Sequence, residues 1–459
     1  MTCCSIIPPY ILERLAAGSA GETAAARADQ TLRVQERLRR DRLGVAGRAT
    51  RPGLPVIEPL PGDGPHRTIH DAAGTEDLPG VVVRREGEDP TDDASVTRAY
   101  DGLGATWDLL ATYGRDSLDG RGLPLTATVH FGQHYDNAFW DGSRMVFGDG
   151  DGVIFNDFTC SVDVIGHELV HGVTQYTSGL NYRGQSGALN ESVSDVFGVL
   201  VRQRLLGQRA EDADWLIGAE LLAPGVHGVA LRSMAAPGTA YDDPRLGKDP
   251  QPDHLDDFVV TSDDNGGVHL NSGIPNRAFH LAATGIGGHA WEGAGAIWWD
   301  TITGDIRADC DFATFAGLTV RAARARFGGR EADAVAAAWT KVGVSSSPSS
   351  SAPTAPTPRQ DEPSEGGWPP ATLTLRRTGG FAGQVRERRV DVGALPESDA
   401  AAWQDLLRGR GLTDLAGAPS HPDAYCYGVT CDAPALDVLV PEPALPQSVR
   451  DLFERTLRG

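Results

Sequence analysis

With 459 residues, the chain has room for two or three domains, one of which could bury a sizeable core. Its 62 acidic residues outnumber 41 basic ones, and the formal net charge of −21 opposes nonspecific binding to nucleic acid or to an anionic membrane. No apolar run approaches the roughly 18 residues of a membrane span. The six cysteines lack the spacing of a disulfide scaffold, so we expect reduced thiols.

The N-terminal stretch lacks the pattern of a secretory signal. No basic residue precedes its apolar part, and Pro8 and Pro9 interrupt that part. We therefore expect a cytoplasmic protein, or one exported by an unconventional route without a classical signal peptide. Residues 22–43 predict a largely solvated helix, and the prolines between 52 and 65 predict an extended connection.

Residues 67–157 are predicted to be mainly strands. Short β-branched or aromatic runs end in Gly and Asp turns at 80–84, 127–131 and 144–147, and a helical pattern over 93–113 interrupts them. The run 149–152 has the acids of a calcium loop but lacks the remaining oxygen ligands, so it favours a tight turn.

The main chemical signal lies in residues 163–171. His167 and His171 are four positions apart, so on a helix both project from one face, one turn apart. With Glu168 between them they form the H-E-x-x-H arrangement. In it, two imidazoles bind zinc and the carboxylate takes a proton from the bound water.

Catalytic zinc needs a third protein ligand and an open position, and Glu191 is the best candidate for that ligand. It begins a second helical pattern that places Asp195 one turn along on the same face. Asp195 could then accept the free N–H of a ligand histidine.

The rest of the chain divides into a helical part, a linker and a small module. Helices are predicted over 294–306, 312–327 and 330–342. Residues 344–370, rich in Ser and Pro, predict a linker. Beyond it we expect strands at 372–377, 384–392, 425–430 and 436–440 and helices at 399–407 and 446–457, which make an α+β module.

Residues 67–343 resemble the catalytic domain of the thermolysin family of zinc metallopeptidases. The matching motifs, in family order, are 135–140, 145–152, 167–171, Tyr182, 190–191 with Asp195, 231–234 and 264–273. The resemblance implies an α+β, two-lobed fold. A β-rich N-terminal lobe with the zinc helix would span residues 67–180, and a helical C-terminal lobe would span 181–343.

The resemblance also implies residue roles. Glu168 would be the general base, and His269, oriented by Asp264, would stabilise the oxyanion together with Tyr182. Asn190 and Asp195 would support the zinc ligands. The substrate-binding positions would be Asn137, Ala138, Trp140, Val164, Leu231 and Arg232, with a pocket that favours a bulky apolar residue after the cut.

Residues 1–60 look like the short propeptide of the protealysin branch of this family, whose Pro-Pro-aromatic motif corresponds to Pro8, Pro9 and Tyr10. Such propeptides keep the enzyme inactive until they are clipped, so we expect autoprocessing between about residues 44 and 67. A cysteine switch, in which Cys3 or Cys4 caps the zinc, stays open beside the reading of both as ordinary reduced thiols.

The chain departs from the family at a paired calcium site near the zinc. Asp163 and Asp214 keep two ligand positions, whereas Arg202, Leu216 and Ala219 occupy others and cannot ligate a hard cation. We expect no paired calcium site, and Arg202 is a candidate to neutralise Asp163 or Asp214. The sequence leaves open whether a single calcium ion binds elsewhere in the chain.

Residues 371–459 resemble emfourin, a protein inhibitor of protealysin-type enzymes, through segments 376–381 and 425–427. A flexible 26-residue tether over 345–370 would span about 28 Å. The radius of gyration of the catalytic domain should be about 19 Å, so the cleft is within reach. The tether would give a roughly millimolar local concentration, and we expect autoinhibition in cis. The alternative is a module that binds substrate or another partner.

The sequence therefore predicts a zinc-dependent endopeptidase that acts on peptide or protein substrates. The rival interpretation is a non-catalytic assembly with a structural zinc ion. It is disfavoured because structural zinc is usually closed by four ligands rich in cysteine.

Overall fold

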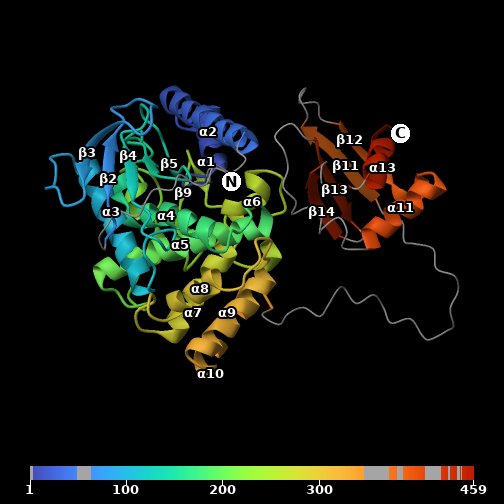
Figure 1. Cartoon of the computed structure of the whole chain (residues 1–459). Helices are drawn as coiled ribbons and strands as arrows, with labels where there is room; N and C mark the ends of the chain where they lie inside the picture. Colours follow the sequence, from blue (N-terminus) through green and yellow to red (C-terminus); the bar gives the residue numbers. More distant parts are fainter. Residues whose placement is uncertain are drawn as a thin grey trace. The chain divides into compact units, whose positions relative to one another are not determined.

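The computed structural model describes residues 4–48, 64–345, 372–379, 386–408, 425–432, 435–441, 445 and 447–458. The chain separates into two compact units (Figure 1): Met1–Arg42 with Val56–Pro353, and Leu43–Pro55 with Thr354–Gly459. Over the described residues, no helix combines the length and the apolar character needed to cross a membrane.

A six-stranded sheet of order β1-β5-β6-β4-β2-β3 forms the N-terminal lobe of the first unit. The strands are β1 (Cys4–Ser5), β2 (Thr68–Asp71), β3 (Val81–Arg85), β4 (Thr126–Val129), β5 (Ala138–Trp140) and β6 (Met145–Phe147). Strand β1 runs antiparallel to β5, with Ser5 opposite Phe139. The N-terminal segment thus adds an outer strand beside β5, which the sequence analysis did not predict.

Helix α3 (Ala94–Thr112) packs on this lobe. It begins after Asp93, whose carboxylate accepts the N–H groups of Ser95 and Val96 and so caps the helix. Apolar residues at helical spacing, Val96, Leu103 and Leu110 among them, are buried in the core of the unit.

Helices α4 (Val162–Tyr176) and α5 (Gly184–Leu206) cross the middle of the unit (Figure 1). On the far side of them from the sheet lie α7 (Gly273–Ile286), α8 (Ala294–Thr303), α9 (Phe312–Arg326) and α10 (Gly329–Lys341). Helix α6 (Asp264–Asn271) lies beside the N-terminal segment, where His269 reaches the carbonyl of Ser5. The segment between α5 and α6 forms two small antiparallel sheets: β7 (Leu216–Ile217) with β8 (Arg232–Ser233), and β9 (Asp242–Asp243) with β10 (Gly247–Lys248).

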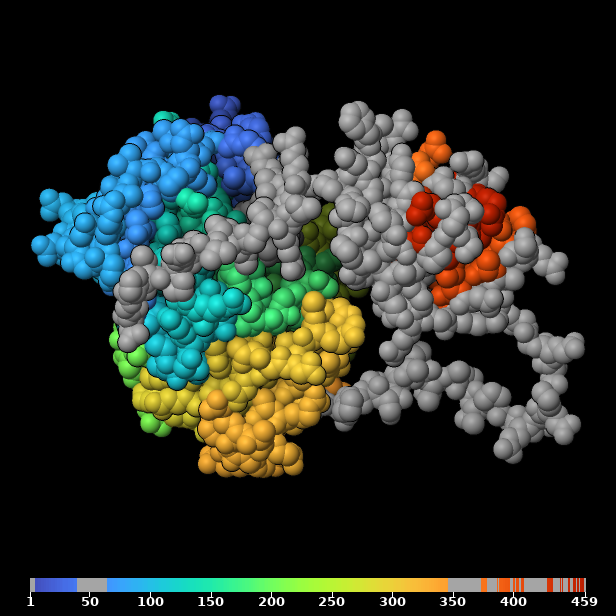
Figure 2. All heavy atoms as spheres, in the orientation of Figure 1, coloured from blue at the N-terminus to red at the C-terminus, as the bar shows by residue number. Residues whose placement is uncertain are grey.

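The N-terminal residues form α1 (Pro9–Arg14) and, after a π-helical turn at Leu15–Ser19, the long helix α2 (Glu22–Arg48). The structure corrects the prediction that this helix is largely solvated. Ala24, Ala28, Thr31 and Val34 are buried, at the spacing of one helical face. Most side chains on this face are small. The sequence prediction rested on the spacing of the leucines, which does not reveal a buried face of alanine and threonine. Arg37 of α2 pairs with Glu76, in the segment after β2. Figure 2 shows the darker blue N-terminal residues against the lighter blue part of the first unit.

The second unit has a four-stranded antiparallel sheet of order β12-β11-β13-β14. Its elements are β11 (Thr372–Gly379), β12 (Arg386–Asp391), α11 (Glu397–Arg408), β13 (Tyr425–Asp432), β14 (Ala435–Pro441) and α13 (Gln447–Arg458). Trp403 of α11 stacks on Phe453 of α13 at 4.9 Å between ring centroids, and its indole N–H donates to Thr456 Oγ1 at 2.8 Å. Tyr427 of β13 packs against Phe453, so the two helices and the sheet share one core.

Candidate active site

Two glycines set the close crossing of α4 and α5. A Cβ atom added to Gly166 would meet the Cα atom of Gly198 at 3.1 Å, and one added to Gly198 would meet the carbonyl oxygen of Asp163 at 2.4 Å. A side chain at either position would therefore push the helices apart. Because the helices approach this closely, the histidines of α4 reach the face of α5 that carries Glu191.

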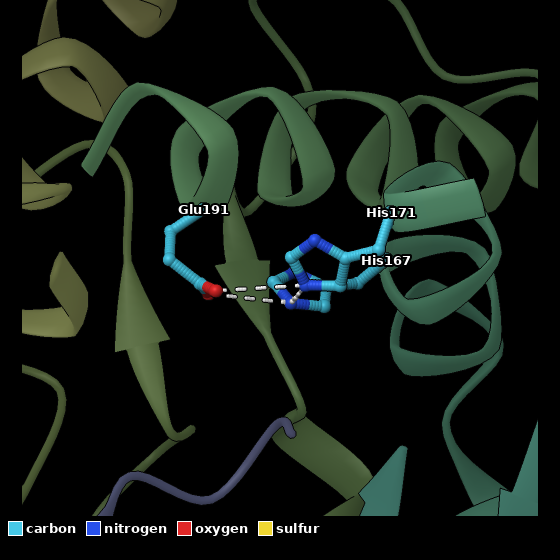
Figure 3. Close-up of side chains that lie close together, drawn as sticks. All are labelled: His167, His171 and Glu191. Carbon is cyan, nitrogen blue, oxygen red and sulfur yellow. Dashed lines mark hydrogen bonds and ion pairs between the residues drawn. The ribbon is translucent and has the colours of Figure 1, made fainter. Parts of the chain in front are cut away.

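Three buried side chains meet at this crossing. The Nε2 atoms of His167 and His171 lie 3.1 Å apart, and each is 3.5 Å from a carboxylate oxygen of Glu191. One ligand atom from each residue falls within 4.8 Å of the others. Figure 3 shows both imidazoles, from α4, directed at Glu191 of α5. Over the described part of the chain, this is the one group of His, Cys, Asp and Glu side chains with such geometry.

The donor set fits a zinc ion. His167 Nδ1 bonds Asp195 at 2.8 Å and His171 Nδ1 bonds Asn190 at 2.9 Å, which leaves both Nε2 atoms facing Glu191. Burial opposes the charge on Glu191, but the facing histidines His269 and His171 outweigh it and hold its pKa well below the usual value. Two imidazoles and one ionised carboxylate are the ligands of a catalytic zinc site that keeps one position open.

Asp195 connects His167, a predicted metal ligand, to Arg232, a predicted substrate-binding residue. Arg232 donates to its two carboxylate oxygens at 2.9 and 2.7 Å, and Asn276 Nδ2 donates at 2.8 Å. Burial alone would raise the pKa of Asp195, but Arg232 and His167 outweigh it and lower that pKa. The sequence analysis missed Asn276, because it lies on α7 and no motif residue marks it.

Glu168 lies beside the triad of His167, His171 and Glu191 and is fully buried. The backbone N–H of Trp140 donates to its Oε2 at 3.0 Å, whereas Oε1 has no hydrogen-bond partner. Burial raises the pKa of Glu168 to about 8. A carboxylate with one oxygen held by strand β5 and the other unengaged is suited to take up and pass on a proton.

His269 faces the triad from α6, beside Tyr182. Its Nδ1–H donates to Asp264 at 2.6 Å, and the Tyr182 hydroxyl lies 3.3 Å from Nε2. Burial alone would lower the pKa of His269, but the charges of Asp264 and Glu191 outweigh it and raise that pKa to about 9. The Tyr182 hydroxyl also donates to Glu191. His269 and Tyr182 can therefore both donate to an oxygen bound at this side of the triad.

Left-handed backbone precedes His269. Residues 264–267 all have positive φ, including the non-glycine residues Asp264 at 50° and Asn265 at 54°. Such conformations are costly outside glycine, and they persist at sites where the surroundings hold them in place. Here they bring the Asp264 carboxylate back onto both the backbone N–H and the imidazole of His269.

The N-terminal segment crosses this centre. Ile6 N–H donates to the carbonyl of Ala138 at 3.2 Å, and Arg232 donates to the Ile6 carbonyl at 3.2 Å. Ile7 exchanges two hydrogen bonds with the Asn137 side chain, at 2.9 and 3.0 Å. Ile6 and Ile7 are both completely buried. The positions predicted to hold substrate therefore hold residues of the same chain.

The other predicted residues lie around this segment. Pro8 and Pro9 follow Ile7, and Pro9 begins α1, which suits a residue without an N–H donor. Burial raises the pKa of Tyr10 well above its usual value. Val164 on α4 and Leu231 before β8 are buried, and the Trp140 indole donates to Gln175 at 3.3 Å. Cys3 lies outside the described residues and only the backbone of Cys4 is described, so the cysteine switch stays untested. Among the described thiols, Cys160, Cys310 and Cys431 are free.

Arg202 occupies the region of the expected calcium ligands. Its guanidinium lies 3.7 Å from Asp163, 3.3 Å from Asp214 and 3.1 Å from Glu220. Asp163 is fully buried, and burial raises its pKa to about 6. In the 149–152 run, Asp151 Oδ1 accepts the N–H groups of residues 153–155, so this carboxylate holds a turn as predicted.

This site is that of a metallopeptidase, and the comparisons with known proteins agree. Residues 71–175 match the thermolysin metallopeptidase catalytic domain, and residues 178–344 match its alpha-helical domain. The chain belongs to the thermolysin family of metallopeptidases, which is zinc-dependent. Residues 375–457 match emfourin.

Three relatives are similar over most of the first unit. An extracellular metalloprotease of Pectobacterium carotovorum subsp. carotovorum is 53% identical over 343 residues, which are 74% of this chain and 96% of that protein. Protease PrtS of Photorhabdus sp. (strain Az29) is 53% identical over 283 residues, 61% of this chain and 76% of that protein. The structure of the precursor of protealysin, a metalloproteinase from Serratia proteamaculans, is 51% identical with a TM-score of 0.68, and the match covers 74% of this chain and all of that one.

Proposed function

We propose that this chain is a zinc endopeptidase made as a proenzyme, which cuts before a bulky apolar residue. His167, His171 and Glu191 are the zinc ligands. The observation that carries the proposal is the three buried donor atoms within 4.8 Å of one another, beside a Glu168 oxygen without a partner.

Each residue around the triad has its own role in hydrolysis. Zinc held by these three ligands would activate a water molecule and polarise the peptide carbonyl that the water attacks. Glu168 accepts the proton of that water and passes it to the leaving nitrogen. His269 and Tyr182 donate hydrogen bonds to the oxyanion, a kind of contact that is worth roughly 3–4 kcal/mol per donor. Asn137, Ala138 and Arg232 hold the backbone of the substrate.

The propeptide restrains the enzyme by occupying these same groups. Strand β1 and Ile6–Ile7 take the hydrogen bonds of β5, Asn137 and Arg232, so a substrate cannot bind until they leave. Most of the expected processing window lies outside the described residues. At its far end, the backbones of Pro65 and Thr68 are both bonded to Leu125, so we expect the cut before Pro65.

The test of this function is Glu168→Gln. The variant keeps the size of the side chain and the acceptor for the Trp140 N–H, but it cannot act as a base. It should bind zinc and fold like the wild type and lose proteolysis of a casein substrate by 10³-fold or more. Glu211→Gln, on an exposed loop, is the matched control and should keep full activity. A proteolytically active Glu168→Gln enzyme would contradict the assignment.

For the C-terminal unit we propose inhibition in cis, released by cutting the linker. Its match to emfourin, together with a tether long enough to reach the cleft, supports this role. A module that binds substrate or another protein is the alternative. A chain that ends at Val344 should be more active than the full chain once the propeptide is removed. Equal activity of the two would exclude inhibition in cis and leave the alternative.

A further inference from the structure

The N-terminal segment lies in the candidate active site as an added strand beside β5. Strand β1 is antiparallel to β5, with Cys4 opposite Trp140 and Ser5 opposite Phe139. Peptides that add to an exposed sheet edge bind through such main-chain pairing. Register then decides which of their carbonyl groups meets the catalytic residues.

The carbonyl that meets them belongs to Ser5. Its oxygen lies 3.2 Å from His269 Nε2, the nitrogen that also lies 3.3 Å from the Tyr182 hydroxyl. Nδ1 of His269 donates to Asp264, so Nε2–H is directed at the Ser5 oxygen as it would be at a developing oxyanion.

The residue after this carbonyl is Ile6, and its contacts are those expected of the residue after a cut. Its N–H donates to the Ala138 carbonyl and its own carbonyl accepts from Arg232, both at 3.2 Å. Asn137 then holds the N–H and the carbonyl of Ile7. Ile6 is bulky, apolar and completely buried, which is the type of side chain that the proposed specificity requires.

The groups needed for hydrolysis surround the Ser5–Ile6 bond. Trp140, the register partner of Cys4, holds Glu168 through its N–H and leaves the other carboxylate oxygen without a partner.

We propose that the enzyme cleaves its own chain between Ser5 and Ile6, at a site distinct from the cut that separates the propeptide from the catalytic domain. This inference rests on the proposed function. One water molecule adds across the peptide C–N bond: its hydroxyl goes to the Ser5 carbonyl carbon, and its proton goes through Glu168 to the Ile6 nitrogen. The products are a short peptide that ends at Ser5 and a chain that begins at Ile6.

This cut would be the first step of activation. It removes the strand β1 that pairs with β5, while Ile6, Ile7, α1 and α2 stay attached to the rest of the chain. Because the bond is held in its own active site, cleavage is intramolecular. Its rate constant should be independent of protein concentration.

The test follows the intact mass and the N-terminal sequence of the full chain after zinc is added to metal-free protein, at two concentrations tenfold apart. The wild type should lose the residues before Ile6 with the same rate constant at both concentrations. Glu168→Gln should keep them. Ser5→Ala should still be cut at this bond, and Ile6→Asp should not, because a charged side chain replaces the buried apolar one.

A synthetic peptide of residues 1–12 tests the same cut and does not require a variant to fold. Processed enzyme should cut it once, between Ser5 and Ile6. Hydrolysis of casein without this cut in either chain or peptide, or a cut at a neighbouring bond, would overturn the register and leave the proposed function standing. Failure to hydrolyse casein, peptide and chain alike would overturn both.

Discussion

Arg232 and Asp195 form a buried two-point ion pair, with nitrogen–oxygen distances of 2.9 and 2.7 Å. Asp195 Oδ1, which accepts from Arg232 Nη2, also accepts the Nδ1–H of His167. The remaining guanidinium nitrogen, Arg232 Nη1, donates to the Ile6 carbonyl. One pair of charges therefore orients His167, a proposed zinc ligand, and binds the carbonyl of Ile6. Occupation of the cleft and geometry of the metal site are linked through it.

Asp195→Asn should lower both the stability of the fold and the affinity for zinc. The amide keeps the size of the carboxylate but leaves the charge of Arg232 unpaired in a buried position, which costs about 3–5 kcal/mol. Loss of the carboxylate behind a ligand histidine should also lower zinc affinity by roughly 10–100-fold. Chemical denaturation of the zinc-free protein and a competition assay for zinc measure the two effects separately.

The control is Asp300→Asn, which removes a partly exposed pair with Arg326. It should cost about 1 kcal/mol or less, because surface pairs contribute little. Equal effects of the two substitutions would contradict the role of Asp195 as a link.

Arg202 should make the stability of the enzyme independent of calcium. Its guanidinium lies among Asp163, Asp214 and Glu220 and supplies positive charge where acids alone would attract a cation. The melting temperature of the zinc-loaded enzyme should be the same in millimolar calcium and in a calcium-selective chelator. A rise of several degrees with calcium would refute this account.

Arg202→Met tests how much this guanidinium contributes to the stability of the fold. It leaves the buried Asp163 without its cation, so it should cost about 3–5 kcal/mol at neutral pH and less in mild acid, where Asp163 is protonated. Arg326→Met, at a partly exposed pair, is the control and should cost about 1 kcal/mol or less. Similar losses for both variants at neutral pH would argue against a special role of Arg202.

Asp136 should make the propeptide-bound form less stable as pH rises. Asp136 is 1% exposed beneath α2, its backbone N–H donates to Thr31 Oγ1 at 3.2 Å, and its Oδ1 has no hydrogen-bond partner. Burial, with the nearby charge of Asp151, raises the pKa of Asp136 to about 8. The folded state thus holds a proton that the unfolded chain, with an ordinary pKa near 4, has lost.

The sign of this effect follows from linkage. Between about pH 4 and pH 8 the folded state binds more protons than the unfolded state, so Asp136 makes the free energy of unfolding fall as pH rises through that window. Asp136→Asn should remove this part of the slope in a series of denaturation curves. Asp242→Asn, at an exposed position, should leave the slope as in the wild type. A steeper fall in Asp136→Asn would show the sign to be wrong.

Sequence predicted those parts of the molecule whose patterns are local. The helices over 294–303, 312–326 and 329–341 fall within about three residues of their expected ends, as do the strands and helices of the second unit, because hydrophobic spacing reports the buried face. His167, His171 and Glu191 were predicted to share one ion, since each lies on a helix whose period fixes its direction.

Contacts across long separations in sequence were not predicted. Nothing in Ser5–Ile7 marks a strand, because its two-residue ladder exists only when β5 is beside it. Asn276 lies 81 residues from Asp195 in the chain, and its part at the site depends on how α7 packs on α5. The buried face of α2 was not predicted for another reason. Alanine and threonine allow the helix to pack closely on the lobe, but they give only a weak hydrophobic pattern in the sequence.

Trp403→Ala should abolish the fold of the C-terminal unit and leave the peptidase unit intact. The indole is fully buried, stacks on Phe453 and donates to Thr456, so its removal should cost about 3–5 kcal/mol, a large fraction of the stability of so small a core. If this unit inhibits in cis, the variant with its propeptide removed should reach the activity of the chain that ends at Val344. Trp403→Phe, which keeps the stacked ring, should stay closer to the full chain. Activity of Trp403→Ala equal to that of the full chain, together with loss of the C-terminal fold by limited proteolysis, would show that the unit does not restrain the enzyme.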